Sequence, residues 1–429
     1  MRISRVTRTH VATVLVVAVA LVMAGPRMQA PARPASAAGI APYRGLGTWV
    51  DIYDTAQFDH PVATVKAMKR RGVRTLFLET GNYTRGPIYR PAAAARFIHA
   101  AHRRNMRVIA WYLPSFTDPD VDFERAMASV RFRTARGHRF DGFGLDIEAT
   151  NEDDLSLRIQ RMLDLSRRIR NAVGDSYSLG AIVPSPFGMK RVPHYWGPVR
   201  DFPWAELSRI YDAIVPMSYF SYRVNGMRGV YEYNAFNIRL IRQESGNPEV
   251  PIHLIGGIAG DTTQREIRGY VRAVRSFGAP GGSLYAFDST RAEHWRELRQ
   301  IPVNPRQSPP LPIPLGQGPW MQAVGNVPGE DRSHPKEVFF RVGPRSEPLL
   351  LEFEAFDIEP DEVKLQVNWR SMTSVPPGPE RAWDAPRAIR IPAWRFHPDR
   401  PSLISFVARG DHPDWSVWGV RNVASGPAP

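Results

Sequence analysis

The chain contains no cysteine among its 429 residues. Disulfide bonds, thiolate metal sites and a cysteine nucleophile are therefore excluded. No two histidines have the His-x-x-x-His spacing that places a pair of metal ligands on one face of a helix. The sequence gives no indication of a bound metal, and we predict an activity that needs no cofactor.

Long hydrophobic runs are scarce, and the one candidate lies at the N-terminus. Arg2, Arg5 and Arg8 precede an apolar run of about 13 residues, which is short of the roughly 20 that a membrane span needs. Small residues around Ala37 follow this run. Because this order is typical of a secretory signal peptide, we predict a signal peptide over residues 1–37 and a secreted mature protein that is not inserted in a membrane. An uncleaved signal anchor is the alternative.

Blocks of basic residues are also missing, although the net charge is +14. Five of the positive charges belong to arginines before Ala38, which leaves +9 for the remaining chain. A basic surface can favour anionic cell-envelope polymers. However, the arginines are scattered, and no lysine–arginine block alternates with aromatic residues as a nucleic-acid-binding face requires. We therefore expect no nucleic-acid partner and a basic surface that is mainly solvated.

Short apolar runs alternate with helical patterns across residues 38–301. The strand candidates are Gly45–Ile52, Val73–Glu79, Met106–Leu113, Asp141–Glu148, Tyr177–Val183, Asp212–Tyr219, Val250–Ile258 and Gly282–Asp288. The segment after the fifth candidate is rich in proline and is expected to be a long loop. Eight βα units predict an α/β fold, a (β/α)8 TIM barrel with a parallel sheet. The alternative, an open doubly wound sheet, would usually carry a glycine-rich phosphate turn, which we do not find.

The composition changes after Ile301, where prolines become dense. We predict a semi-rigid linker over residues 302–319. Residues 320–429 contain short alternating runs separated by proline, glycine and aspartate, which predicts a small antiparallel β-sandwich. Some tryptophans of this module either fill its core or form platforms that bind polysaccharide: Trp369, Trp383, Trp394, Trp415 and Trp418.

The fourth strand candidate ends in two acids. Since side chains alternate along a strand, Asp146 and Glu148 lie on one face with Gly142 and Gly144, while Phe143, Leu145 and Ile147 lie on the other. Active sites of such barrels form at the C-terminal ends of the strands. Two carboxyls there suit glycosidic hydrolysis, in which Glu148 protonates the leaving oxygen and Asp146 raises the pKa of that acid by its charge.

Other acids and aromatic residues are expected at the same end of the barrel. Aromatic faces cover the C–H surface of sugars, and carboxylates accept hydrogen bonds from sugar hydroxyls, so this lining is typical of a carbohydrate cleft. The residues that we expect to bind substrate there are Trp49, Glu79, Trp111, Met217, Tyr219, Tyr285 and Asp288.

The run Asp141-Gly142-Phe143-Gly144-Leu145-Asp146-Ile147-Glu148 resembles the Asp-Gly-x-Asp-x-Asp-x-Glu signature of family 18 glycoside hydrolases, the chitinases and their relatives. Met217-Ser218-Tyr219 is similar to that family's sixth-strand Met-x-Tyr. The resemblance implies Glu148 as proton donor, Asp146 as the residue that polarises the substrate's 2-acetamido group, and a retaining hydrolysis of chitin or a similar glycan. It also implies roles in the site for Asp141, Met217 and Tyr219.

This sequence departs from the family pattern at three places. Gly144 replaces the middle aspartate, Tyr285 or Phe287 replaces an eighth-strand tryptophan, and Glu79 lies where the family has Ser-x-Gly-Gly. These departures keep two alternatives open. One is a hydrolase of another polysaccharide, such as a galactosaminoglycan, that uses Glu148 with Glu79 or Asp146. The other is a lectin that binds a glycan in the same cleft without cleaving it.

Overall fold

The structure is a computed structural model that describes residues 37–247, 249–304, 313–315, 323–328, 337–409 and 417–428. The predicted signal peptide therefore lies outside the described residues except for Ala37. Within the described ranges, no helix is both long enough and apolar enough to cross a membrane.

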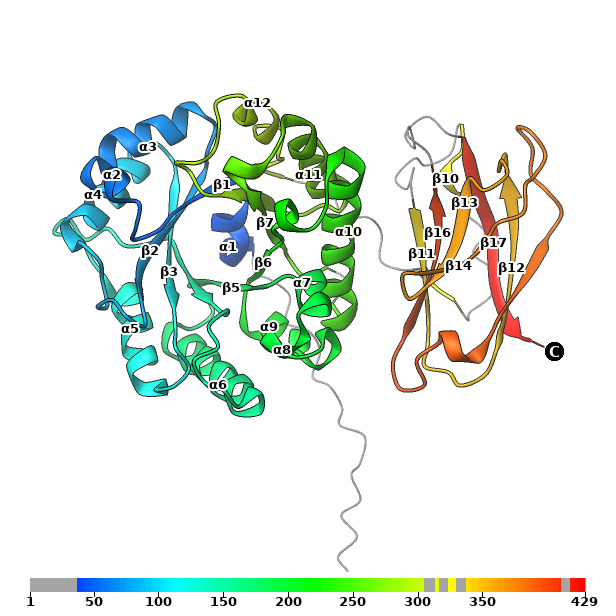
Figure 1. Ribbon diagram of the computed structural model, residues 1–429, viewed down its shortest axis with the longest axis horizontal. Helices are drawn as coiled ribbons and strands as arrows, with labels where there is room; N and C mark the ends of the chain where they lie inside the picture. The colour runs from blue at the N-terminus through cyan, green and yellow to red at the C-terminus, as the bar shows by residue number, and fades with distance from the viewer. Residues whose placement is uncertain are drawn as a thin grey trace, which may run out of the picture. The chain divides into compact units, whose positions relative to one another are not determined.

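Eight parallel strands close into a barrel in the order of the sequence, with β1 paired to both β2 and β8 (Figure 1). This confirms the predicted TIM barrel. The strands are β1 Gly45–Val50, β2 Thr75–Asn82, β3 Arg107–Leu113, β4 Gly142–Asp146, β5 Ser178–Pro184, β6 Ala213–Met217, β7 His253–Ile258 and β8 Gly281–Tyr285.

Helices follow every strand and cover the outside of the barrel. They are α2 Thr55–Asp59, α3 Pro61–Arg70, α4 Pro91–His102, α5 Pro119–Arg131, α6 Leu155–Val173, α7 Pro186–Arg191, α8 Pro193–Trp196, α9 Trp204–Ile210, α10 Gly226–Glu244, α11 Gln264–Ser276 and α12 His294–Leu298. The long loop predicted after β5 is partly wrong, because α7 and α8 lie in it. Pro186 and Pro193 begin these two helices, where a missing N–H costs nothing.

The N-terminal end of the barrel is closed by a short segment, α1 Ala37–Ile40 with a 3-10 turn over Ala41–Tyr43. Its carbonyl groups accept hydrogen bonds from the first residues of three strands. Ser178 Oγ donates to Gly39, Thr75 Oγ1 donates to Pro42 at 2.6 Å, and His253 Nδ1 donates to Tyr43 at 2.8 Å. This end of the barrel is therefore filled by the chain itself.

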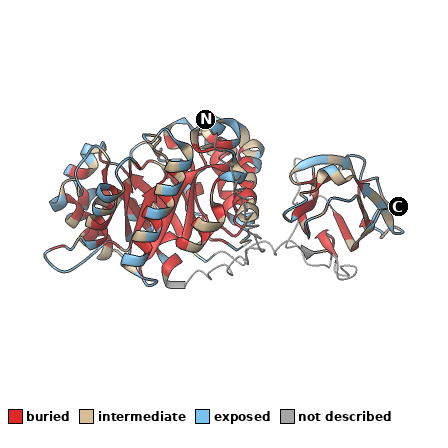
Figure 2. Cartoon of the chain, turned by 90° about the horizontal axis from the view of Figure 1, so that it is seen from below, coloured by how far each residue is buried: buried red, intermediate tan, exposed pale blue. Residues whose placement is uncertain are grey.

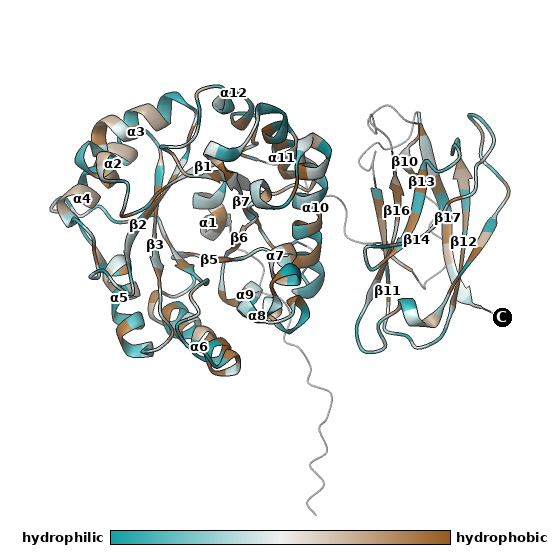
Figure 3. Cartoon of the chain, viewed as in Figure 1, coloured by the Kyte–Doolittle hydropathy of each residue, from teal (hydrophilic) through white to brown (hydrophobic). Residues whose placement is uncertain are grey.

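Apolar residues are separated into a core inside the barrel and a larger core between strands and helices. Figures 2 and 3 show the strands as mainly buried and apolar, with exposed, hydrophilic residues on the outer faces of the helices. Phe143 and Leu145 of β4 belong to the outer core, whereas Trp111 and Ile182 on the neighbouring strands belong to the inner one. The inner positions of β4 are therefore those of Gly142, Gly144 and Asp146, as predicted.

The C-terminal region forms two sheets, which confirms the predicted all-β module. One sheet has the order β10-β17-β12-β15 and the other β14-β13-β16-β11-β9. Phe353 and Phe406 pack across the two sheets with ring centroids 4.8 Å apart. The strands are β9 Ile313–Pro314, β10 Val324–Asn326, β11 Glu337–Val342, β12 Leu349–Phe356, β13 Val363–Val367, β14 Arg370–Ser374, β15 Arg387–Ile391, β16 Ser402–Ala408 and β17 Trp418–Pro427.

Strand β9 falls within the predicted linker, because Ile313 and Pro314 pair in parallel with Phe340 and Arg341. The tryptophans of the module differ in their surroundings. Trp418 is fully buried, and the Trp383 ring lies under the Arg421 guanidinium at 4.2 Å. Trp394 is 72% exposed, and the Arg395 guanidinium lies over its indole ring at 4.3 Å. Trp369 packs against Phe339 at 5.4 Å, and Trp415 lies outside the described residues.

Candidate active site

Strand β4 ends at Asp146, and Glu148 follows in the turn after it. The predicted strand Asp141–Glu148 is thus shorter at both ends. The backbone N–H of Ile147 still donates to the carbonyl of Ile182 at 2.7 Å, which keeps the turn beside β5. Asp146 therefore lies at the inner edge of the barrel and Glu148 lies further out, at the entrance.

Asp146 has the most unfavourable surroundings for a charge. Its residue is 5% exposed, and its Oδ1 atom has no hydrogen-bond partner within the described residues. Burial raises the pKa of the Asp146 carboxyl, and the charges of Glu148 and Glu79 raise it further. Burial also raises the pKa of Glu148. The pair therefore retains a proton at a pH where isolated carboxyls would be ionised.

The position of Glu148 is fixed through its backbone. Trp196 Nε1 donates to the Glu148 carbonyl at 3.1 Å, and the Arg158 guanidinium lies over the Trp196 ring at 4.8 Å. Arg158 also donates to the carbonyl of Glu152 at 2.7 Å. The turn that carries the acid is thereby held through its backbone, and among the described residues the Glu148 carboxylate forms no ion pair.

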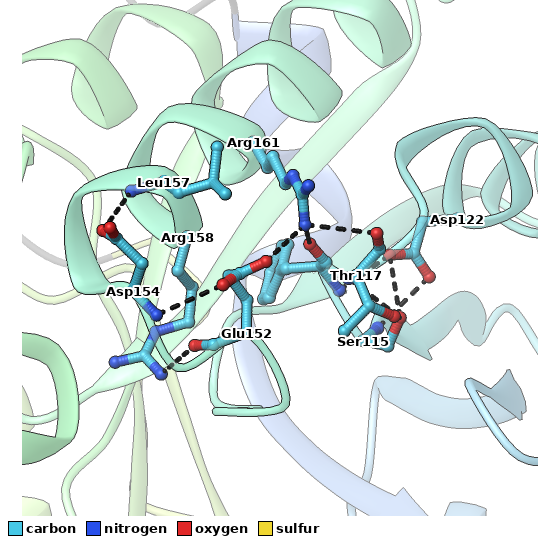
Figure 4. A network of polar contacts seen from close by, with 9 residues as sticks. Ser115, Thr117, Asp122, Glu152, Asp154, Leu157, Arg158 and Arg161 are labelled. Carbon is cyan, nitrogen blue, oxygen red and sulfur yellow. Dashed lines mark hydrogen bonds and ion pairs between the residues drawn. The ribbon is translucent and has the colours of Figure 1, made fainter.

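A polar network joins the loop after β4 to the loop after β3 (Figure 4). Arg161 on α6 pairs with Glu152 at 2.5 Å and donates to the carbonyls of Phe116 and Thr117 at 3.0 and 3.1 Å. Asp154 caps α6 by accepting from the N–H of Leu157 at 3.0 Å. Because both loops border the site, this network fixes one side of its entrance.

Glu79 on β2 is the third buried carboxyl. Its Oε2 accepts from the N–H of Ile52 at 3.0 Å, and its Oε1 accepts from Asn82 Nδ2 at 3.1 Å. Burial raises the pKa of Glu79 to about 7, against the lowering effect of the Ile52 hydrogen bond and with a further increase from the charge of Asp51. The charge of Glu79 also acts on Asp146. The structure thus brings these two residues together.

Two aspartates from the loop after β1 extend the group of acids. Tyr285 OH at the end of β8 donates to Asp51 Oδ2 at 2.6 Å, and the N–H of Asp51 donates to Asp54 Oδ2 at 3.1 Å. Burial raises the pKa of Asp54 to about 7. The charges of Asp51 and of the exposed Asp288 also raise it, whereas the hydrogen bond from the Asp51 N–H lowers it. Asp288 therefore lies at the rim of this group.

Tyrosines surround the carboxyls on the side of β6. Tyr219 lies two residues after Met217, and its ring centroid is 6.2 Å from that of Tyr285. Burial raises the pKa of the Tyr219 phenol well above its usual value, and the charges of Glu148 and Asp146 add to this. Its hydroxyl therefore stays protonated and can donate a hydrogen bond. Met217 is partly buried beside this ring in the inner core.

Trp49 does not line an open surface, contrary to the prediction. It is 2% exposed, its ring stacks on Phe77 at 4.2 Å, and its Nε1 donates to Ser283 Oγ at 2.8 Å. It is part of the floor below the site, because its side chain points into the filled interior of the barrel. Trp111 is also buried, but its Nε1 has no partner within the described residues, which leaves one donor for a ligand.

Asp141 lies at the opposite end of β4 and is not part of the site. Its carboxylate accepts from His102 Nε2 and Arg107 at 2.9 Å and from the N–H of Val108 at 2.8 Å. Although burial raises its pKa, these hydrogen bonds outweigh that effect and hold the pKa below its usual value. The substrate-binding role expected for Asp141 is therefore withdrawn in favour of a structural one.

The space of the missing middle aspartate is occupied by Ile182. A Cβ atom at Gly144 would lie 2.9 Å from Ile182 Cδ1 and 3.6 Å from Trp111 Cβ. The glycine therefore lets the Ile182 side chain of β5 pack closely against β4. An aspartate at position 144 would not fit without a shift of Ile182.

Sequence reasoning missed Asp54 and Tyr195. The charges of Glu148 and Asp146 raise the pKa of Tyr195 in addition to its burial, which places it close to the pair. Asp54 lies in the loop after β1 and Tyr195 in the short helix α8 after β5, and only their position on the C-terminal side of the barrel could have indicated them. Among the described residues, no group of three or more His, Asp and Glu side chains is arranged to hold a metal ion.

No protein-family model and no curated protein matches the sequence. Solved structures with a similar fold include an endo-β-1,4-mannanase from Thermotoga petrophila, with 10% identity, a TM-score of 0.48 and coverage of 90% of this chain and 98% of that one. The spore cortex-lytic enzyme SleL from Bacillus cereus has 10% identity, a TM-score of 0.46 and coverage of 60% and 74%. A chitinase from Bacteroides thetaiotaomicron has 11% identity, a TM-score of 0.45 and coverage of 60% of this chain and 95% of that one. Likenesses this distant carry no argument about the reaction.

Proposed function

We propose that the chain is a secreted glycoside hydrolase that cleaves an amino-sugar polymer, such as chitin or a cell-envelope glycan. The observation that supports this most is the pair Asp146 and Glu148 at the entrance of the barrel, buried or half-buried and without an ion pair in the described chain. Two acids in such a place destabilise the fold. A catalytic role accounts for their presence.

In the proposed reaction, Glu148 is the general acid. Its raised pKa keeps a proton available, and its place beyond the end of β4 lets it reach a glycosidic oxygen. Asp146 would stabilise the positive charge that develops at the neighbouring sugar carbon or orient a 2-acetamido group, and Tyr219 would donate a hydrogen bond to the same group. The resemblance to family 18 favours retention of configuration.

The second candidate is a glycan-binding protein without hydrolytic activity. The packing at Gly144 favours it, because the chain lacks the third acid of the related signature and Ile182 would have to shift to admit one. Glu79, whose charge acts on Asp146, is the acid that could replace it in an active enzyme.

The test is hydrolysis of a panel of purified polysaccharides by the unsubstituted protein and by Glu148→Gln. The substitution removes the transferable proton and keeps the side-chain volume, so we expect loss of about 100-fold or more in kcat with little change in binding of insoluble polymer. Glu152→Gln is a useful comparison, because Glu152 supports the loop without facing the pair. It should weaken the fold more than the chemical step.

Release of reducing ends that disappears in Glu148→Gln supports the hydrolase. Binding of a polymer with no cleavage by either form would contradict the hydrolase and favour the glycan-binding protein. Equal cleavage by both forms would exclude Glu148 as the acid. Secretion is tested separately by the N-terminal sequence of the exported protein, which we expect to begin near Ala38.

A further inference from the structure

Six carboxyl groups gather at the C-terminal end of the barrel without a basic partner. They come from the ends of four strands and the loops that follow them: Asp51 and Asp54 after β1, Glu79 on β2, Asp146 and Glu148 at β4, and Asp288 after β8. Within the described part of the chain, none of them forms an ion pair with lysine, arginine or histidine. The whole chain nevertheless has 56 lysines and arginines.

Acids elsewhere on the barrel are commonly paired with arginine. Asp212 pairs with Arg170 at 2.8 Å in a buried position. Other pairs lie on the surface, such as that between Asp59 and Arg90 at 2.6 Å. Arginine thus supplies a counter-charge to acids elsewhere on the barrel, both buried and exposed. Because the described residues place no basic side chain in an ion pair with the six acids, a ligand can supply the positive charge there.

Two observations besides the number of acids point to a ligand. The Oδ1 atom of Asp146 is buried and unpartnered, and an acceptor in that condition costs stability unless a donor arrives. In addition, several of the acids are held in place. Tyr285 orients Asp51, while Ile52 and Asn82 orient Glu79. Such preorganisation is expected of a binding site.

We propose that this end of the barrel binds protonated primary amines of a glycan, so that the substrate is an amino-sugar polymer with free amino groups rather than a fully N-acetylated one. This inference rests on the proposed function, because it names the substrate class of the same site. An ammonium group offers three donors and a full positive charge, and Asp146 with Glu79 or Asp51 with Asp54 would supply acceptors.

A polymer suits this arrangement better than a single metal ion. No three of the acids converge as metal ligands, and they extend instead from β4 across β2 to the loop after β1. Successive amines along a glycan can each meet a different pair. The raised pKa values of Glu79 and Asp54 agree with a group of acids that lacks its counter-ion, because an ammonium ion nearby would lower both values.

The experiment compares matched glycans that differ only in the acetyl group. The full-length Glu148→Gln protein would be titrated calorimetrically with oligosaccharides of β-1,4-linked glucosamine and of α-1,4-linked galactosamine, each as the free amine and as the N-acetylated form. We expect the free-amine form of one pair to bind about tenfold or more tightly, since charge-assisted hydrogen bonds are stronger than neutral ones. This preference should weaken markedly from about 0.05 M to about 0.5 M salt.

Variants locate the preference. Asp54→Asn should reduce the advantage of the amine several-fold, because it removes one carboxylate and keeps the shape of the side chain. The matched control is Glu124→Gln on α5. Glu124 is an exposed acid outside the site, and it pairs with Arg131 at 3.3 Å. This control should leave the preference unchanged. A preference equally reduced by the control would overturn the proposed site.

Hydrolysis of the same glycans by the unsubstituted protein separates the two proposals. Cleavage of N-acetylated glycans together with equal or tighter binding of them would overturn the amine site and leave the hydrolase intact. Salt-sensitive binding of the free amines without cleavage of any glycan would support the amine site and overturn the hydrolase. Failure of Glu148→Gln to bind either form of either pair would also overturn the amine site.

Discussion

The two ends of strand β4 carry aspartates in opposite electrostatic surroundings. Asp141, just before the strand, accepts hydrogen bonds from His102, Arg107 and the backbone, and its pKa is lowered despite its burial. Asp146, at the other end, is buried beside two further acids, and its pKa is raised. The same residue type thus stabilises one end of the barrel and destabilises the other.

This difference agrees with a barrel in which one end stabilises the fold and the other end carries the proposed activity. The N-terminal end is filled by Ala37–Tyr43, and its polar groups are paired. The C-terminal end keeps unpaired acids on strand ends and loops. In a TIM barrel, residues at the first end serve stability and those at the second serve the reaction. Substitutions at the two ends should therefore change different measurements.

The largest expected effect is that of Asp146→Asn on turnover. Removal of the carboxylate beside Glu148 should lower kcat by about 100-fold or more with whichever polymer the unsubstituted protein cleaves. The free energy of unfolding at neutral pH should not fall, because Asp146 Oδ1 has no partner to lose. Steady-state kinetics measures the loss of kcat, and chemical denaturation measures the free energy of unfolding. A less active protein that is also clearly less stable would mean that Asp146 is structural.

Gly144→Asp tests whether the site tolerates the third acid of the related signature. We expect a loss of roughly 3 kcal/mol in the free energy of unfolding, because the new side chain meets Ile182 and adds a buried charge. Gly144→Ala adds only the Cβ contact and should cost less. Addition of Ile182→Ala to Gly144→Asp should recover part of the loss in a denaturation experiment. No difference between the single and double variants would contradict the packing explanation.

Asp141→Asn is the counterpart at the paired end. The loss of the negative charge removes the counter-charge of Arg107 and weakens three hydrogen bonds, so we expect a decrease of about 2 kcal/mol in the free energy of unfolding. The kcat of the folded protein should stay the same. A change in kcat without a change in stability would mean that Asp141 acts in the reaction, and it would contradict the difference described between the two ends of β4.

Much of this division could be predicted from the sequence. The alternation of glycine and acid against Phe143, Leu145 and Ile147 correctly gave the inward face of β4, because side-chain direction in a strand depends only on parity. The order of eight strands likewise predicted the closed barrel. Side-chain alternation is local, and the strand pattern is repeated eight times. Both predictions therefore hold even when a strand end is misplaced by about two or three residues.

Depth along the barrel axis could not be predicted. Trp49 and Trp111 have the same residue type and both face inward, yet Trp49 forms the floor, whereas Trp111 Nε1 has no partner among the described residues. Which layer a side chain occupies depends on the stagger between strands, and the sequence does not record it. Asp141 was misplaced for a similar reason, since a signature alone does not show where a strand begins.

The smallest expected effect is a change in how stability depends on pH. The pKa of Glu79 is raised from its ordinary value near 4.5 to about 7 in the folded protein. Between these two values the folded state binds more protons than the unfolded state, so the free energy of unfolding falls as the pH rises. Near pH 6 this slope should be about 1 kcal/mol per pH unit, and at pH 7, where the folded carboxyl is half ionised, it should be about 0.7 kcal/mol per pH unit.

Glu79→Gln should reduce the measured slope between about pH 6 and pH 7 by the share of this one carboxyl, because glutamine does not titrate, while Asp54, whose pKa is also raised to about 7, continues to contribute. The absolute stability of this variant is a poorer measure, since its amide N–H2 group would face the N–H2 group of Asn82 and lose one hydrogen bond. Urea denaturation at a series of pH values gives the slope directly. Glu124→Gln is the control, because this exposed acid on α5 lies outside the site. An unchanged slope in Glu79→Gln would contradict the assignment of the slope to Glu79, and an equal change in Glu124→Gln would show that the effect is not specific to the site.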